Sequence, residues 1–142
     1  KKIVNVKKGQ FLSHREVENI ILKIENRNNN KILITERGNS FGYNYLINDF
    51  KGIHFMKQFG YPIVFDSTHS VQLPGGMGIK SGGAREYVVP LSKSAASLRL
   101  AGFFIETHPN PEKALSDGPN MMHLHNMPKL LNSINKINKA AK

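Results

Sequence analysis

The chain has 142 residues, 39% of them hydrophobic, which suits one globular domain. It contains no apolar run near the roughly 20 residues that cross a bilayer and no secretory signal at its basic start, so we expect a cytoplasmic protein that does not act at a membrane. The formal net charge of +10 is scattered, and its one helical lysine spacing, near the end of the chain, has no aromatic side chains, which argues against nucleic-acid binding and fits an enzyme for anionic phosphates. The absence of cysteine excludes disulfides, thiol nucleophiles and thiolate metal ligands within the chain.

Four short apolar runs, each followed by polar residues, predict four parallel strands. Their content of Ile, Val and Phe is typical of strands that are covered on both faces. Each gap between them is long enough for a helix, which indicates repeated βα units. The runs, with their polar ends, cover residues 3–10, 31–37, 62–69 and 102–108.

The first two helices have clear boundary signals. Ser13 and Glu16 match the S-x-x-E capping box, and apolar residues follow at helical spacing, which predicts a helix over 14–26. A second helix is expected over 46–58, with Gly60 as its stop signal. The side chains expected to face inward from it are Ile47, Phe50, Ile53 and His54, and we interpret this histidine as structural.

The second half of the chain predicts two more helices. The third begins near Pro90 and ends before Gly102, and the fourth begins at Pro128. Polar segments rich in glycine, asparagine or proline are expected to be irregular loops. The segment after the third strand would be a lid over an anionic substrate, with Lys80 or Arg85 as contacts. These loops cover 38–44, 70–85 and 108–120.

The architecture expected from these elements is (βα)4, an α/β fold in a single domain over residues 1–142. Four units are half of a βα-barrel and leave two unpaired sheet edges. The sequence also lacks an initiating Met. We therefore expect the chain to be part of a longer protein or one product of a split gene.

Polar residues at the strand ends are expected to converge on one mouth, because the carboxyl ends of parallel strands carry the chemistry of such folds. Lys7, Lys8 and Arg37 are cations that could grip a phosphate or carboxylate, although each alone is more often a surface charge. The full set is Lys7, Gln10, Glu36, Arg37, Asp66, His69, Glu106 and His108.

His69, Glu106 and Asp117 form a candidate metal set of imidazole and carboxylate ligands. Two other interpretations stay open at this point. His69 is equally suited to general acid–base chemistry or to a structural hydrogen bond. Carboxylates at such a mouth equally orient cations or bind sugar hydroxyls.

Six segments resemble the 3-deoxy-D-manno-octulosonate 8-phosphate synthase family, in the same order and over nearly the whole chain. They cover residues 7–11, 33–43, 64–76, 81–87, 104–110 and 116–121. The resemblance implies an aldolase-type TIM (βα)8 barrel, of which this chain would be the carboxyl-terminal half with the last four βα units.

The resemblance also implies an activity. The family is a transferase that condenses phosphoenolpyruvate with D-arabinose 5-phosphate and releases phosphate, in lipopolysaccharide biosynthesis. The expected protein is a cytoplasmic homotetramer with no organic cofactor. Two alternatives stay open: a catalytically incompetent chain that only assembles with another chain, and the related aldolase that joins phosphoenolpyruvate to erythrose 4-phosphate.

By the same resemblance, Lys7 and Arg37 would hold the phosphate of phosphoenolpyruvate, with Gln10 beside it. His69, Glu106 and Asp117 would surround the reacting carbons and, in metal-dependent members, ligate a divalent ion. Ser116 replaces the cysteine usual in the metal-independent branch, whereas the Gly-Pro that follows Asp117 is typical of it, so a divalent metal is only weakly favoured. The other substrate-binding residues implied are Phe41, Lys80, Arg85 and Asn120.

Overall fold

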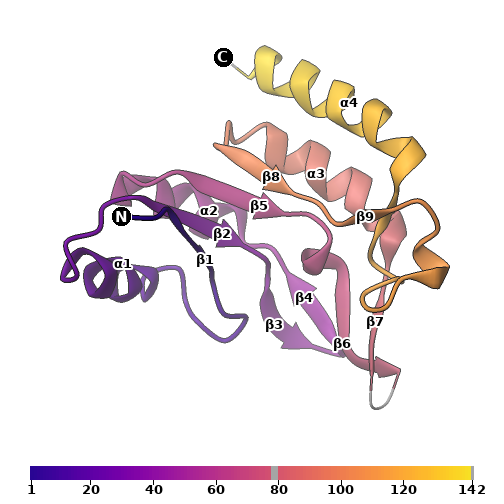
Figure 1. The fold of residues 1–142 in the computed structure, drawn as a ribbon, viewed down its shortest axis with the longest axis horizontal. Helices are drawn as coiled ribbons and strands as arrows, with labels where there is room; N and C mark the ends of the chain where they lie inside the picture. Colours follow the sequence, from indigo (N-terminus) through magenta and orange to yellow (C-terminus); the bar gives the residue numbers. More distant parts are fainter. Residues whose placement is uncertain (78–79, 142) are drawn as a thin grey trace.

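The fold is built on one sheet of four parallel strands (Figure 1). The structure is a computed structural model that describes residues 1–77 and 80–141, without the side chains of 76–81. The strands pair in chain order: β1 (Val4–Lys7), β2 (Ile32–Glu36), β5 (Ile63–Asp66) and β8 (Gly102–Phe104). All three pairings are parallel. The four strands predicted from the apolar runs are therefore confirmed.

A helix comes after each of these four strands in the chain, which confirms the predicted order of four βα units. The helices are α1 (Val17–Glu25), α2 (Phe50–Met56), α3 (Val88–Ala96) and α4 (Met127–Ala140). One face of the sheet packs against α1, α2 and α3 through a core that includes Ile34, Ile53 and Phe65, each with no exposed surface. A second core joins α3 to α4, and Figure 1 shows these two helices side by side.

The other face of the sheet is less completely buried. Because side chains alternate along a strand, Asn5 and Lys7 of β1 point away from the helices, and both are exposed. On this face the Thr35 hydroxyl donates a hydrogen bond to Asn5 Oδ1 at 2.6 Å. The sequence predicted strands covered on both faces, which is only partly the case for β1.

The predicted capping box is confirmed at the start of α1. The Ser13 backbone N–H donates to Glu16 Oε2 at 2.8 Å, and the Glu16 backbone N–H donates to Ser13 Oγ at 3.3 Å. The α-helix proper begins at Val17, three residues later than predicted, because the residues before it form turns.

The prediction for the second helix is wrong at its start. The helix begins at Phe50, where Asp49 caps it by accepting a hydrogen bond from the Lys51 backbone N–H. Ile47 lies in a strand and is 46% exposed, and His54 is also exposed, so neither faces inward. A short 3-10 turn, Lys57–Phe59, follows α2, and Gly60 ends it at φ 78°, as its stop signal predicted.

Two of the three predicted loops are antiparallel hairpins. Residues 38–44 contain β3 (Asn39–Gly42), which pairs with β4 (Tyr45–Ile47), and 70–85 contain β6 (Gln72–Met77) paired with β7 (Lys80–Gly83). In the first hairpin, Tyr43 and Asn44 both have positive φ, 51° and 58°, as a tight two-residue hairpin turn requires. The asparagine and glycine residues thus mark a turn between strands. Figure 1 shows both hairpins beyond the carboxyl ends of the main strands.

The third predicted loop, 108–120, is mostly irregular, as expected. It is closed by a short parallel pairing of β9 (Thr107–His108) with β10 (Met122–His123). On the last helix, Leu130 and Ile134 are buried, whereas Leu131 is 46% exposed.

The main sheet stays open in the described part of the chain, where β1 and β8 form its edges. Among the described residues, no helix has both the length and the apolar character needed to cross a bilayer.

Candidate active site

The carboxyl ends of the parallel strands bring several of the predicted polar residues together. Lys7, at the end of β1, places its Nζ 2.8 Å from Asp66 Oδ2, 3.2 Å from His69 Nδ1 and 4.0 Å from the centre of the Phe104 ring. The strand register explains the meeting, because paired residues on neighbouring strands point to the same face of the sheet. The pairings run from Lys7 through Thr35 to β5, and from Asp66 to Phe104, so Lys7, Asp66 and Phe104 lie on one face. Asp66 is fully buried, and the Lys7 side chain is 37% exposed.

Asp66 fixes the orientation of His69. Its carboxylate accepts hydrogen bonds from the His69 backbone N–H at 2.9 Å and from ring Nδ1 at 2.8 Å. Burial opposes ionisation of Asp66, but the hydrogen bonds from His69 and Lys7 outweigh it and lower the pKa of this carboxyl. Because an ionised carboxylate can only accept, His69 carries its proton on Nδ1 and directs Nε2 toward Glu106, whose Oε1 lies 3.5 Å away.

His69, Glu106 and Asp117 meet as predicted. One ligand atom from each lies within 4.8 Å of those of the other two. Glu106 Oε2 is buried and has no hydrogen-bond partner among the described residues, as expected of a carboxylate oxygen that is available to a ligand. An imidazole nitrogen with two carboxylates suits a divalent transition metal, so these residues fit the metal that the sequence favoured.

Arg37 is tied to this group through Gln72, which sequence reasoning missed. Arg37 Nη2 donates to Gln72 Oε1 at 2.5 Å, and Gln72 Nε2 donates to Asp117 Oδ1 at 2.8 Å. Arg37 Nη2 also lies 3.4 Å from the His69 carbonyl oxygen, and the buried Nε of Arg37 has no partner in the part of the chain that the structure describes. Gln72 was part of a predicted loop, so its position at the start of β6 could not be inferred.

Two residues assigned to the mouth do not join it. Lys8 and Glu36 are fully buried on the helix-covered face of the sheet, 3.6 Å apart between Nζ and Oε2. The reason is strand alternation, which sends Lys8 opposite to Lys7 and Glu36 opposite to Arg37. Burial lowers the pKa of Lys8, opposed by the charge of Glu36.

The remaining predicted residues lie in different settings. Gln10 Oε1 is buried, and no described residue hydrogen-bonds to it. Phe41 is 75% exposed on the β3–β4 hairpin, and Asn120 is buried against Gly83, where a Cβ would lie 1.5 Å from Asn120 Oδ1. His108 Nδ1 accepts a hydrogen bond from the backbone N–H of Asn110. The side chain of Lys80 lies outside the described residues.

Arg85 is already engaged by a neighbouring loop. Its guanidinium donates to Glu112 Oε1 at 2.9 Å and to the Gly118 carbonyl oxygen at 2.6 Å, and it lies 3.0 Å from His123 Nε2. Gly118 follows Asp117 directly. Arg85 therefore holds the loop that carries a candidate metal ligand.

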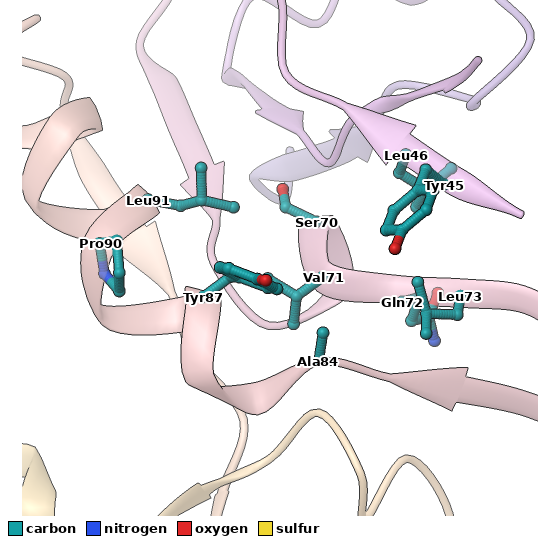
Figure 2. Close-up of a pocket in the computed structure, with 10 residues that line it drawn as sticks. All are labelled: Tyr45, Leu46, Ser70, Val71, Gln72, Leu73, Ala84, Tyr87, Pro90 and Leu91. Carbon is teal, nitrogen blue, oxygen red and sulfur yellow. The ribbon is translucent and has the colours of Figure 1, made fainter. Parts of the chain in front are cut away.

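An apolar pocket of about 210 Å³ lies beside this site and shares Gln72 with it. Figure 2 shows Tyr45 and Leu46 on one side of the pocket and Tyr87, Pro90 and Leu91 on the other. None of its lining residues is charged. Its chemistry does not suit a phosphate, so the candidate active site is the cluster at the strand ends.

Comparisons with known proteins show which family the chain resembles. A sequence profile of the DAHP synthetase I family matches residues 1–142. The chain is 50% identical to a 2-dehydro-3-deoxyphosphooctonate aldolase from Geobacter metallireducens over 140 residues, 99% of this chain and 52% of that protein. Proteins with the same name from Citrifermentans bemidjiense and Agrobacterium fabrum are 51% and 49% identical, over 96% and 94% of this chain and 50% and 47% of their own lengths.

The chain thus spans about half the length of the curated relatives it matches. Because the family profile covers all of its residues, the chain belongs to the DAHP synthetase I family.

Proposed function

We propose that this chain forms the carboxyl-terminal half, the last four βα units, of a TIM-barrel 3-deoxy-D-manno-octulosonate 8-phosphate synthase. The reaction condenses phosphoenolpyruvate with D-arabinose 5-phosphate and releases phosphate. The observation that carries the proposal is the placement of Lys7 and Arg37 beside His69, Glu106 and Asp117, in a chain about 50% identical to relatives named as this aldolase. As the family resemblance implies, the whole protein would be a cytoplasmic homotetramer without an organic cofactor.

The reaction requires a site that holds one anion firmly while a carbon–carbon bond forms. Carbon 3 of phosphoenolpyruvate attacks the aldehyde carbon of the sugar, whose oxygen takes a proton. Water adds at carbon 2, and the bond between carbon 2 and the phosphate oxygen breaks. Lys7 and Arg37 supply the positive charge for the phosphate, both as it binds and as it leaves.

The buried Asp66 keeps His69 Nε2 directed at the carboxylates of Glu106 and Asp117. These three residues would hold a divalent ion. When bound, such an ion supplies Lewis-acid polarisation of an oxygen on the substrate. Gln72 keeps Asp117 and Arg37 at a fixed separation, so that the phosphate and the reacting carbons are presented together.

The open edges of the sheet support the assignment to half of a barrel. β1 and β8 lack further partners in the described chain, and a closed barrel would pair both of them. The polar and exposed Asn5 and Lys7 would then line the barrel interior. We infer that the other segment of the whole protein supplies the missing strands and the contacts to arabinose 5-phosphate.

The test uses a chimera in which residues 1–142 replace the matching segment of the Geobacter metallireducens relative. It should release phosphate from phosphoenolpyruvate only when arabinose 5-phosphate is present. The description of the family profile favours one second candidate, condensation with erythrose 4-phosphate. Phosphate release from phosphoenolpyruvate with erythrose 4-phosphate, but not with arabinose 5-phosphate, would establish that candidate. No phosphate release with either sugar would overturn both candidate functions.

A further inference from the structure

Two pairs of adjacent charged residues at the strand ends divide their charges between the two faces of the sheet. In Lys7–Lys8, the first side chain lies at the mouth and the second is buried beneath it. In Glu36–Arg37, the first is buried and the second lies at the mouth. The two proposed phosphate cations are therefore each joined through the backbone to a buried charge, and the buried charges pair with each other.

The buried charge cluster consists of Lys8, Glu36 and His14. Lys8 Nζ lies 3.6 Å from Glu36 Oε2, and His14 Nε2 lies 3.1 Å from the same oxygen. The side chains of Lys8 and Glu36 are 0% exposed, and that of His14 is 10% exposed. None of these three residues takes part in the proposed chemistry.

The cluster also fixes both chain segments that leave the strands. Lys8 Nζ donates to Asn39 Oδ1 at 2.8 Å and to the carbonyl oxygens of Gly9 and Leu12, both at 3.2 Å. Glu36 Oε1 accepts a hydrogen bond from the Gly38 backbone N–H. The segments after Lys7 and around Arg37 are thus held to one another by side chains as well as by the strand pairing.

Fold stability alone does not account for a buried ion pair at this place. Removing two charges from water costs free energy that the pair rarely recovers, and apolar side chains of similar volume often stabilise a protein at least as well. A charge pair with directional hydrogen bonds does, however, allow only one relative placement of the two strand ends. Placement matters at this site, because a shift of about 1 Å in a binding group can cost about a hundredfold in rate.

We propose that Lys8, Glu36 and His14 are positioning residues that set the separation of Lys7 and Arg37 for the phosphate of phosphoenolpyruvate. This inference rests on the proposed function. It predicts an effect confined to one substrate. Disturbing the cluster should raise KM for phosphoenolpyruvate and leave KM for arabinose 5-phosphate nearly unchanged.

The first variants, made in the chimera, are Lys8→Met and Glu36→Gln. In each, the new side chain has nearly the shape of the one it replaces. Each should raise KM for phosphoenolpyruvate about tenfold to a hundredfold. The double variant Lys8→Met/Glu36→Met removes both charges, so it should unfold at a higher temperature than Lys8→Met while KM stays raised. If KM returns to normal as stability returns, the cluster only stabilises the fold and the inference is overturned.

Gly52→Ala provides a test that removes no charge. A Cβ at Gly52, in α2, would lie 2.1 Å from His14 Nδ1, so the ring must move from its place beside Glu36. The expected result is again a raised KM for phosphoenolpyruvate. The matched control is Met56→Ala, which truncates a fully buried side chain of α2 that has no part in the cluster. It should lower the unfolding temperature and leave both KM values unchanged.

The outcomes distinguish a failure of the proposed function from a failure of this inference alone. An unaltered chimera that releases no phosphate overturns the proposed function and this inference with it. An active chimera in which Glu36→Gln and Gly52→Ala keep the original KM for phosphoenolpyruvate overturns the inference alone. A KM change of similar size in Met56→Ala would also overturn it, because general loosening of the fold would then explain the effect.

Discussion

Asp66 accepts hydrogen bonds from both the backbone and the ring of His69, at 2.9 and 2.8 Å, so one buried carboxylate sets both the position and the tautomer of this histidine. Lys7 Nζ lies 2.8 Å from Oδ2 of Asp66, the oxygen that the His69 ring also contacts, whereas the His69 backbone N–H donates to Oδ1. The proposed phosphate site and the candidate metal site therefore share Asp66 as a common support.

Replacing Asp66 with Asn should weaken the metal site. The Asn side chain keeps the shape but removes the charge that holds the proton on His69 Nδ1. Loss of such a supporting group typically costs about 10- to 100-fold in metal affinity or activity. Metal affinity is measured in the chimera by competition with a coloured chelator. Glu18→Gln, an exposed carboxylate of α1, is the control. Equal metal affinity in Asp66→Asn and the control would contradict the supporting role.

The lowered pKa of Asp66 predicts a dependence of stability on pH. A carboxyl whose pKa is lower in the folded state stabilises the fold above its unfolded value of 3.8, and this contribution disappears as the pH falls through the folded pKa. The difference in free energy of unfolding between the unaltered chimera and Asp66→Asn should therefore be constant near neutral pH and shrink below the unfolded value. Urea titrations at a series of pH values measure it. A difference that grows on acidification would show that the sign is wrong.

Arg37→Ala tests the phosphate assignment. Removing one charge-assisted hydrogen bond to an anion should cost about 1.5 to 3 kcal/mol of binding free energy, or roughly 10- to 150-fold. The steady-state KM for phosphoenolpyruvate in the chimera provides the measurement. Arg27→Ala, outside the mouth, should leave this KM unchanged. Arg37 is misassigned if its own variant has the original KM and turnover.

Removing divalent ions tests the metal assignment. If His69, Glu106 and Asp117 hold a metal that the reaction needs, exhaustive chelation should abolish phosphate release, and a divalent ion should restore it. Glu106→Gln should require a higher concentration of that ion for half-maximal recovery. Full activity after chelation would instead leave the three residues to act on the substrates directly.

The strands and much of the site were predictable because their signals are local. Apolar runs gave the four strands, and the polar residues directly after them include Lys7, Asp66 and His69, which meet in the structure. Asp117 comes from a later loop, and it was grouped with His69 and Glu106 first by residue type, as imidazole and carboxylate ligands, and then by the family resemblance.

The sequence misled where a local signal has two structural meanings. Asn44 and the neighbouring glycine residues indicated a loop, but Asn44 also suits the two-residue turn of a hairpin, where it has a positive φ. Lys8 and Glu36 are charged residues of the kind that usually lie at the surface, and only the alternation of strand faces places them in the interior. Gln72 was missed because its two hydrogen bonds join residues far apart in the chain.

The most direct test of the proposed half-barrel compares the 142-residue chain alone with the same chain mixed with the remaining segment of the Geobacter metallireducens relative. Alone, the chain exposes both edges of its main sheet, so it should self-associate or pack loosely and release no phosphate. The mixture should form one complex by size-exclusion chromatography and release phosphate from phosphoenolpyruvate only with arabinose 5-phosphate. A compact monomer of the 142-residue chain that catalyses this reaction by itself would contradict the account.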